Sequence, residues 1–121
     1  MTEEQMLANQ ALIKNAYAAF NARDIDSILK VMHPQVKWTK AWEGEYANGH
    51  DEVRAYWTKQ WTEINPNVTP VGFRERANGT FEVEVDQLVK DLDGNVLFNG
   101  KVKHVYVIND GLLQQMDVEA Y

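Results

Sequence analysis

Apolar residues at helical spacing open the ordered pattern of this chain. One face of the segment 12–20 would carry an unbroken apolar stripe formed by Leu12, Ile13, Ala16, Tyr17 and Phe20. This i, i+3, i+4, i+7 spacing predicts an amphipathic helix whose stripe needs a packing partner.

A second, shorter helix is predicted after a break at residues 21–23. Asp24 can cap it, because an aspartate side chain accepts hydrogen bonds from the free amides of a first helical turn. Its buried side would be Ile25, Ile28, Leu29 and Met32. The helix is expected to end at His33-Pro34, since a residue before proline avoids helical backbone angles. Beyond it, the alternation around Val36 and Trp38 indicates a strand.

The middle of the chain predicts a loop followed by a third helix. Asp51 and Glu52 would lie in its first turn, where acidic side chains are favourable against the helix dipole. The inward stripe of this helix would be Val53, Tyr56, Trp57, Gln60 and Trp61. The Asn-Pro-Asn sequence at 65–67 is expected to end it.

Three turn signals divide the C-terminal half into strands. They are Asn-Gly at 78–79, Asp-Gly at 93–94 and Asp-Gly at 110–111, each between runs rich in Val, Phe and Tyr. They predict four antiparallel strands near 68–76, 80–90, 96–108 and 112–119. Strands longer than the usual ~5–6 residues generally coil into a curved sheet.

Turn length fixes how these strands pair. We predict a two-residue turn at 93–94, and three-residue loops with a left-handed glycine at the other two turns. The expected opposite pairs are Val85–Val102, Glu84–Lys103, Phe73–Val83, Val71–Val85, His104–Met116 and Lys103–Asp117. This register places most charges on one face in alternating sign, which is favourable for cross-strand pairs.

The other, inner face would hold the apolar side chains together with Gln87, His104 and Tyr106. Several aliphatic residues nevertheless fall on the charged outer face: Leu88, Leu97, Val105, Val107 and Leu113. A sheet with aliphatic residues on both faces usually has a cover on each. Because the helices are needed on the inner face, we expect a second copy of the chain on the outer one, and therefore a homodimer.

Composition narrows the class of protein. The 121 residues, 45% hydrophobic and 25% charged, fit one domain spanning 1–121. The net charge of −6 argues against nucleic acid as a partner. The chain has no cysteine, no apolar run of membrane-spanning length and an acidic start unlike a signal peptide, so no membrane partner and a cytoplasmic location are expected.

The scattered histidines, His33, His50 and His104, lack the spacing of a metal site. There is also no glycine-rich phosphate loop and no nucleophile elbow. We therefore expect no metal and no cofactor.

The order of predicted elements resembles the nuclear transport factor 2-like superfamily. It looks like the branch that includes ketosteroid isomerase and SnoaL-like polyketide cyclases. The local resemblance lies in AYAAFNARDIDSILKVMHPQVKW and HVYVINDGLLQQM, and the overall one covers essentially the whole chain. It implies an α+β fold in which a cone-shaped, curved antiparallel sheet wraps around three N-terminal helices, with a pocket between sheet and helices. It does not select a function, because the superfamily spans isomerases, cyclases, dehydratases, binding proteins and transport factors.

The catalytic residues of the isomerases have no counterpart here. Those enzymes use a tyrosine of the first helix and an aspartic acid of the sheet as an oxyanion hole, and a strand aspartate as the base. Counting from the shared N-A-x-D-x-D break, the tyrosine position falls on Ala16, with Tyr17 beside it. The base position falls on Lys40, and the second acid falls near Lys103 or His104. Isomerisation by that mechanism is therefore not expected.

His104 is the candidate catalytic residue. It should project inward among apolar side chains, where burial would keep it neutral and able to act as acid, base or hydrogen-bond donor. The alternative is a core histidine bonded to a nearby oxygen.

Aromatic residues exceed what a core of this size needs, so several should line a cavity or its mouth. The predicted ligand-binding residues are Tyr17, Trp38, Trp42, Tyr56, Trp57, Trp61, Gln87, Tyr106 and Met116. Lys40 is a further candidate, as a cation or an amine nucleophile.

Two functional hypotheses follow. In the first, the chain holds a small apolar or aromatic ligand, as an enzyme of isomerase, cyclase or dehydratase type or as a binder. In the second, it is a non-catalytic dimeric association module that uses the outer sheet face. A cavity between sheet and helices would favour the first.

Overall fold

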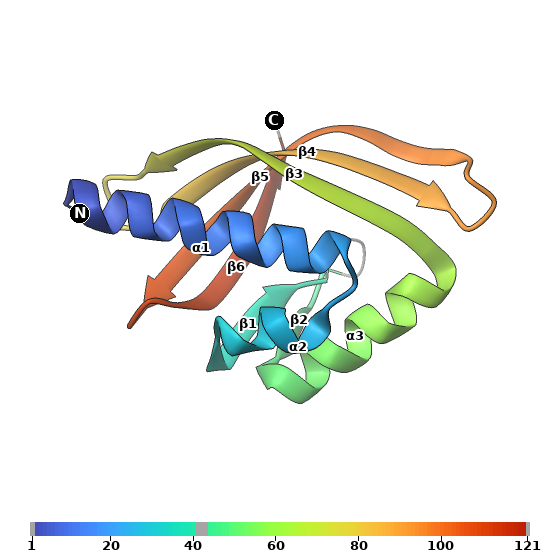
Figure 1. Ribbon diagram of the computed structural model, residues 1–121, viewed down its shortest axis with the longest axis horizontal. Helices are drawn as coiled ribbons and strands as arrows, with labels where there is room; N and C mark the ends of the chain where they lie inside the picture. Colours follow the sequence, from blue (N-terminus) through green and yellow to red (C-terminus); the bar gives the residue numbers. More distant parts are fainter. Residues whose placement is uncertain (1, 41–43, 121) are drawn as a thin grey trace.

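The computed structural model describes residues 2–40 and 44–120 and shows three helices on one side of a curved, unclosed sheet (Figure 1). The helices are α1 (Glu3–Asn21), α2 (Ile25–Lys30) and α3 (Gly49–Glu63). The strands are β1 (Met32–Thr39), β2 (Tyr46–Asn48), β3 (Ile64–Glu75), β4 (Phe81–Asp91), β5 (Val96–Asn109) and β6 (Leu112–Ala120). They follow the order β2-β1-β6-β5-β4-β3, and every neighbouring pair is antiparallel except β1 with β6. The predicted fold class is confirmed.

The helix boundaries follow local hydrogen bonds. Thr2 and Gln5 form a reciprocal capping box, so α1 begins nine residues before the apolar stripe of the sequence, at Glu3. Asp24 caps α2 by accepting from the backbone amide of Ser27 at 3.3 Å.

Two predicted helix ends are wrong. The second helix stops at Lys30, and His33-Pro34 lies inside β1, because the amide of Leu113 on β6 binds the carbonyl of Val31 and the strand starts there. The segment 65–67 likewise belongs to β3, which begins directly after α3. Its proline is tolerated because β3 is an edge strand.

The predicted pairing of β4 with β5 is confirmed: Val85 lies opposite Val102 and Glu84 opposite Lys103. The predicted two-residue turn is wrong, since the loop covers 92–94 with a left-handed glycine at its end. Leu97 is an extra residue in a bulge that compensates for the longer loop. The register predicted for β4 and β5 was therefore correct, although the predicted turn was not.

The hairpin of β3 and β4 has the predicted loop at 77–79, and Phe73 lies opposite Val83. The predicted pair Val71–Val85 is wrong. Pro70 occupies the position opposite Val85, and Val71 is the bulged residue and is exposed.

The closing hairpin of β5 and β6 differs more. Asp110 and Gly111 both have positive φ, 55° and 72°, as a two-residue type I′ turn requires. A bulge between Val107 and Ile108 adds to the shift. Lys103 therefore faces Glu119 instead of Asp117, and His104 faces Val118 instead of Met116, which lies opposite Tyr106.

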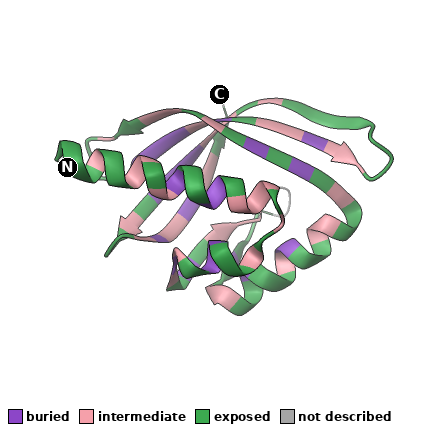
Figure 2. Ribbon diagram, in the orientation of Figure 1, coloured by how far each residue is buried: buried purple, intermediate pink, exposed green. Residues whose placement is uncertain are grey.

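The core lies between the inner face of the sheet and the helices, where the buried residues gather (Figure 2). Leu113 was predicted on the outer face, and this prediction is wrong. It belongs to this core and is 1% exposed. The shifted closing hairpin accounts for the change of face.

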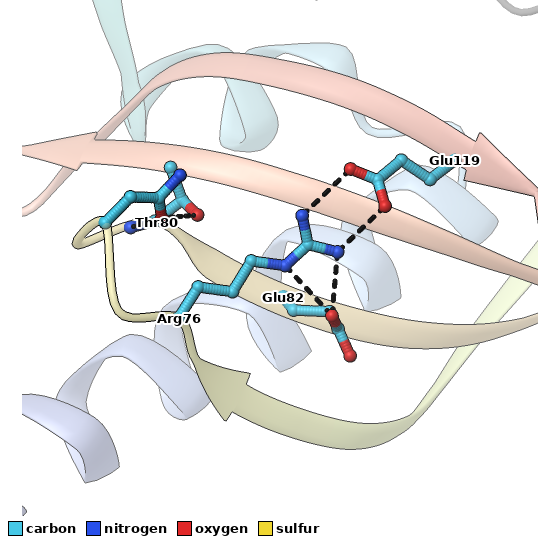
Figure 3. Close-up of polar contacts among 5 residues, drawn as sticks. Arg76, Thr80, Glu82 and Glu119 are labelled. Atoms are coloured by element: carbon cyan, nitrogen blue, oxygen red, sulfur yellow. Dashed lines mark hydrogen bonds and ion pairs between the residues drawn. The ribbon is translucent and has the colours of Figure 1, made fainter.

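On the outer face, Val105 is only 7% exposed without any second copy of the chain. Arg76 binds Glu82 of β4 and Glu119 of β6, each at 2.8 Å (Figure 3). Because β5 lies between those strands and Val105 pairs with Glu82, these ion pairs cross the sheet beside Val105. Val105, which we expected a partner to cover, is thus already buried within one chain.

Candidate functional site

A cavity opens between the inner sheet face and the helices. Its lining comes from all three helices and most strands: Ala16, Tyr17, Phe20, Ile28, Trp38, Thr39, Tyr56, Trp57, Gln60, Ile64, Pro66, Val68, Gln87, Val89, His104, Leu113, Met116 and Val118. The empty volume, counted out to the open mouth, is about 760 Å³. Part of this volume lies open to solvent.

One wall of the cavity is aromatic. The ring of Trp57 meets that of Trp38 edge to face at 5.2 Å between centroids, and that of Phe20 at 5.4 Å. Trp57 is buried, whereas Trp38 and Phe20 are half-buried. Edge-to-face contacts of this kind stabilise the packing of the rings against one another.

The deep end of the cavity carries a chain of polar groups. The hydroxyl of Tyr17, from α1, lies 2.5 Å from Nδ1 of His104 and 2.6 Å from the hydroxyl of Tyr106, both from β5. All of these side chains are buried. These hydrogen bonds join the first helix to the centre of the sheet.

Burial sets the charge state of these three side chains. It lowers the pKa of His104 to about 4, so the imidazole is neutral at pH 7. Burial is also the main cause that raises the pKa of Tyr17 and of Tyr106, and the neighbouring Tyr106 raises that of Tyr17 further. The deep end therefore offers neutral hydrogen-bonding groups.

Half-buried polar residues line the more open part of the cavity. The amide of Gln60 donates to the hydroxyl of Tyr56 at 3.1 Å, and the ammonium of Lys40 lies 5.8 Å from the centre of the Tyr56 ring. Gln87 lines the cavity from β4, and Thr39 does so while its hydroxyl donates to the carbonyl of Met116. Tyr56, Gln60, Gln87 and Thr39 thus add hydrogen-bonding groups to the lining.

The structure brings most of the predicted site residues together. Those that line the cavity are His104, Tyr17, Trp38, Tyr56, Trp57, Gln87 and Met116. Tyr106 lies behind the lining, fully buried, and bonds to Tyr17. Trp61 stacks on Trp57 outside the lining, and Trp42 lies outside the described residues.

The positions that match the isomerase residues do not all lie at the cavity. Ala16 and Tyr17 line the cavity together with His104, and Lys40 lies beside Tyr56. Lys103, in contrast, faces Glu84 and Glu119 on the outer face. Within the described part of the chain, no Asp or Glu lines the cavity.

Sequence reasoning missed the bond of Tyr17 to His104 and Tyr106. The helical stripe and the strand register identified each residue as inward, but the contact depends on how α1 lies across the sheet, and no local pattern fixes that. Phe20, Leu113 and Val118 were also missed as lining residues. The wrong register of β6 explains Leu113, which it assigned to the outer face.

A fold of this kind, with its pocket between cone-shaped sheet and helices, defines the nuclear transport factor 2-like class. The chain belongs to the SnoaL-like domain family, whose model matches residues 13–116. No curated protein matches the chain.

Solved structures agree. TerC, co-crystallised with polyporic acid, is 26% identical to the chain with a TM-score of 0.80, covering 94% of this chain and 92% of its own. An NTF2-like protein of unknown function from Burkholderia pseudomallei is 25% identical with a TM-score of 0.80, covering 94% and 91%. A Mycobacterium tuberculosis protein in complex with estradiol-17β-hemisuccinate shares the fold at 14% identity and a TM-score of 0.77, covering 92% of each chain.

No helix of the described residues is long and apolar enough to cross a membrane.

Proposed function

We propose that this protein binds a small, largely apolar molecule in the cavity between the sheet and the helices. The observation that carries the proposal is the composition of the lining: aromatic and aliphatic walls with a few polar groups, among them His104 bonded to Tyr17. Ligand sites of proteins commonly have this composition. The ligand-bound structures of TerC and of the mycobacterial protein support the same use of the fold.

Binding, without turnover, is the function that the groups at the deep end support best. The basic group there is His104, and its pKa of about 4 makes it a weak proton acceptor at neutral pH. Tyr17 and Tyr106 are weak acids, because burial raises the pKa of each. These residues suit the orientation of a ligand by hydrogen bonds.

The experiment is a thermal-shift and NMR screen of apolar carbonyl and aromatic compounds, with polyporic acid and estradiol-17β-hemisuccinate included. A ligand at about 100 times its Kd should stabilise the folded state by about 2.7 kcal/mol. The cavity-filling variant Val118→Phe should abolish this effect, because the larger ring occupies the lined space.

Val96→Phe is the matched control, since Val96 is exposed on the far end of the β4–β5 hairpin. It should keep the ligand response of the wild type. A ligand that stabilises Val118→Phe as strongly as wild type binds elsewhere, and that result would refute the proposal, as would the absence of any stabilising compound.

A further inference from the structure

We infer that the deep end of the cavity presents a fixed hydrogen-bond donor to the ligand. Such a donor selects ligands with an acceptor oxygen that carries no hydrogen, such as a ketone, aldehyde or quinone carbonyl. This inference rests on the proposed function, because it names the chemical class of ligand for the same cavity. It follows from counting the hydrogens of three bonded side chains, Tyr106, Tyr17 and His104.

The count begins at Tyr106. Its side chain is 0% exposed, and its hydroxyl has one partner among the described residues, the hydroxyl of Tyr17 at 2.6 Å. A buried hydroxyl hydrogen without an acceptor is costly. The Tyr106 hydroxyl therefore donates to the oxygen of Tyr17.

The hydrogen of Tyr17 then has one place to go. Because Tyr17 accepts from Tyr106, its own hydrogen points to its second partner, Nδ1 of His104, at 2.5 Å. Nδ1 must carry a lone pair to accept it. A neutral imidazole with a bare Nδ1 holds its proton on Nε2.

The reverse direction leaves a hydrogen unused. If Nδ1 of His104 donated to Tyr17, then Tyr17 would donate to Tyr106, and the Tyr106 hydroxyl would have no acceptor among the described residues. One arrangement satisfies every hydroxyl, and the other leaves one buried donor unpaired. The difference fixes the tautomer.

Nε2 of His104 faces the free space of the cavity. Within the described part of the chain, the buried side-chain polar atom without a hydrogen bond is Nε1 of Trp61. Nε2 of His104 makes no hydrogen bond to the described residues either, so it is not enclosed by protein, and His104 lines the cavity. The N–H that the tyrosines place on Nε2 is thus presented to a ligand.

Gln87 does not provide the same selection. Its amide lines the cavity and can turn to offer either its oxygen or its NH₂ group. The imidazole cannot change its role without leaving a tyrosine unpaired. Selection for an acceptor therefore comes from His104.

The first test needs no ligand. Long-range ¹H–¹⁵N correlation spectra of the ¹⁵N-labelled protein at neutral pH report which imidazole nitrogen carries the proton. The His104 signal is assigned by its loss in His104→Gln. We expect the Nε2–H tautomer, and a wild-type His104 protonated on Nδ1 would overturn the inference.

Two matched variants test the origin of the tautomer. Tyr17→Phe removes the donor to Nδ1, so His104 should become a mixture of both tautomers. Tyr46→Phe makes the same change at a hydroxyl that binds Asp117 outside the cavity, and should leave the His104 signal unchanged. A pure Nε2–H signal retained in a folded Tyr17→Phe variant would show that the tyrosines do not set it.

The second test compares two ligands of one shape. Acetophenone and α-methylstyrene differ by a C=O in place of a C=CH₂. Wild type should bind acetophenone about 3–10-fold more tightly, the range of one ordinary hydrogen bond. In His104→Leu the ratio should approach one.

The outcomes separate this inference from the proposed function. Equal binding of the two compounds inside the cavity would refute the donor site and leave the binding function intact. Binding of neither compound, together with no hit in the wider screen, would refute the proposed function and the donor site with it.

Discussion

His104 connects the stability of the fold to the cavity. On one side its Nδ1 is held by Tyr17 of α1, and on the other its ring lines the cavity. Removal of the imidazole leaves the buried hydroxyl of Tyr17 without its acceptor, which typically costs about 1–3 kcal/mol. A structural role and a binding role are therefore combined in one residue, and a single truncation affects both.

The pH dependence of stability should report the buried state of this histidine. Burial lowers the pKa of folded His104 to about 4, from 6.5 for an ordinary histidine. Between those values the unfolded chain binds the proton and the folded chain does not, so the free energy of unfolding falls as the pH drops from 6.5 to about 4. The loss is on the order of 3 kcal/mol, and above pH 6.5 this residue adds no pH dependence.

Urea unfolding of wild type and His104→Gln at about pH 7.5, 6 and 5 measures this pH dependence of stability. Glutamine keeps an acceptor for Tyr17 but does not titrate, so the variant should lose less stability on acidification. Parallel losses in both proteins would show that folded His104 is protonated as easily as unfolded His104.

At the residue scale, the sequence predicted which side chains face inward better than it predicted their contacts. Tyr17, Trp57 and Met116 were correctly placed at the cavity because helical spacing and strand alternation assign a face to each residue. The contact of Tyr17 with His104 joins residues far apart in the chain, so it depends on packing that no local pattern encodes.

At the scale of elements, Arg23 follows the end of α1 in a strained backbone conformation. Its φ is +64°, and its guanidinium lies over the rings of Phe20 and Trp61 and donates to Asn65 of β3. A left-handed residue after a helix is usually glycine, because a Cβ there costs about 1–2 kcal/mol. The side-chain contacts, which tie α1 to α3 and β3, offset that strain.

Two substitutions separate strain from contacts. Arg23→Gly and Arg23→Ala both lose the guanidinium, but only alanine keeps a Cβ at positive φ. The glycine variant should therefore be more stable to urea than the alanine variant by about 1 kcal/mol. Ala22→Gly, one residue earlier at φ −82°, should instead destabilise, and the same sign at both positions would contradict this account.

The closing hairpin shows why turn sequences alone gave an uncertain register. The same Asp-Gly pair forms a loop with a left-handed glycine at 93–94 and a two-residue turn at 110–111. Bulges then changed the count of residues on one strand, correcting the register after the first turn and shifting it after the second. A bulge has no sequence signature as strong as that of a turn, so the β4–β5 register was predicted and the β5–β6 register was not.

Double-mutant cycles distinguish the two registers of that hairpin. Lys103 faces Glu119, so Lys103→Met with Glu119→Gln should show a coupling of roughly 0.2–1 kcal/mol in urea unfolding. Lys103→Met with Asp117→Asn is the control and should give a smaller value, because Asp117 lies opposite Val105. A larger coupling to Asp117 would favour the register expected from the sequence.

At the scale of the whole molecule, most of the order of elements was predictable because turns, caps and apolar stripes indicated the next element, and the resemblance to a known superfamily arranged them. The exception is β2, a three-residue strand that lies where a loop was predicted. The cover of the outer sheet face was harder to predict. Val105 is buried within one chain, where its strand neighbour Glu82 binds Arg76, and Leu113 belongs to the inner core. Two of the aliphatic residues that suggested a dimer thus have partners already.

The homodimer expected from the sequence would bury Val107 of the outer face and Leu97 of the β5 bulge, which are 38% and 55% exposed. Light scattering after gel filtration should then give twice the chain mass of 13.9 kDa at micromolar concentration.

Val107→Lys and Leu97→Lys should each shift the mass toward the monomer, because a lysine at an apolar contact must be desolvated. Leu7→Lys, on the exposed side of α1, is the control and should leave the dimer intact. Added salt should weaken the dimer only modestly, because Arg76, Glu82 and Glu119 of this face already form ion pairs within each chain. A wild-type mass of 13.9 kDa at that concentration would rule the dimer out, and the exposed valine and leucine would then be ordinary surface residues of a monomer.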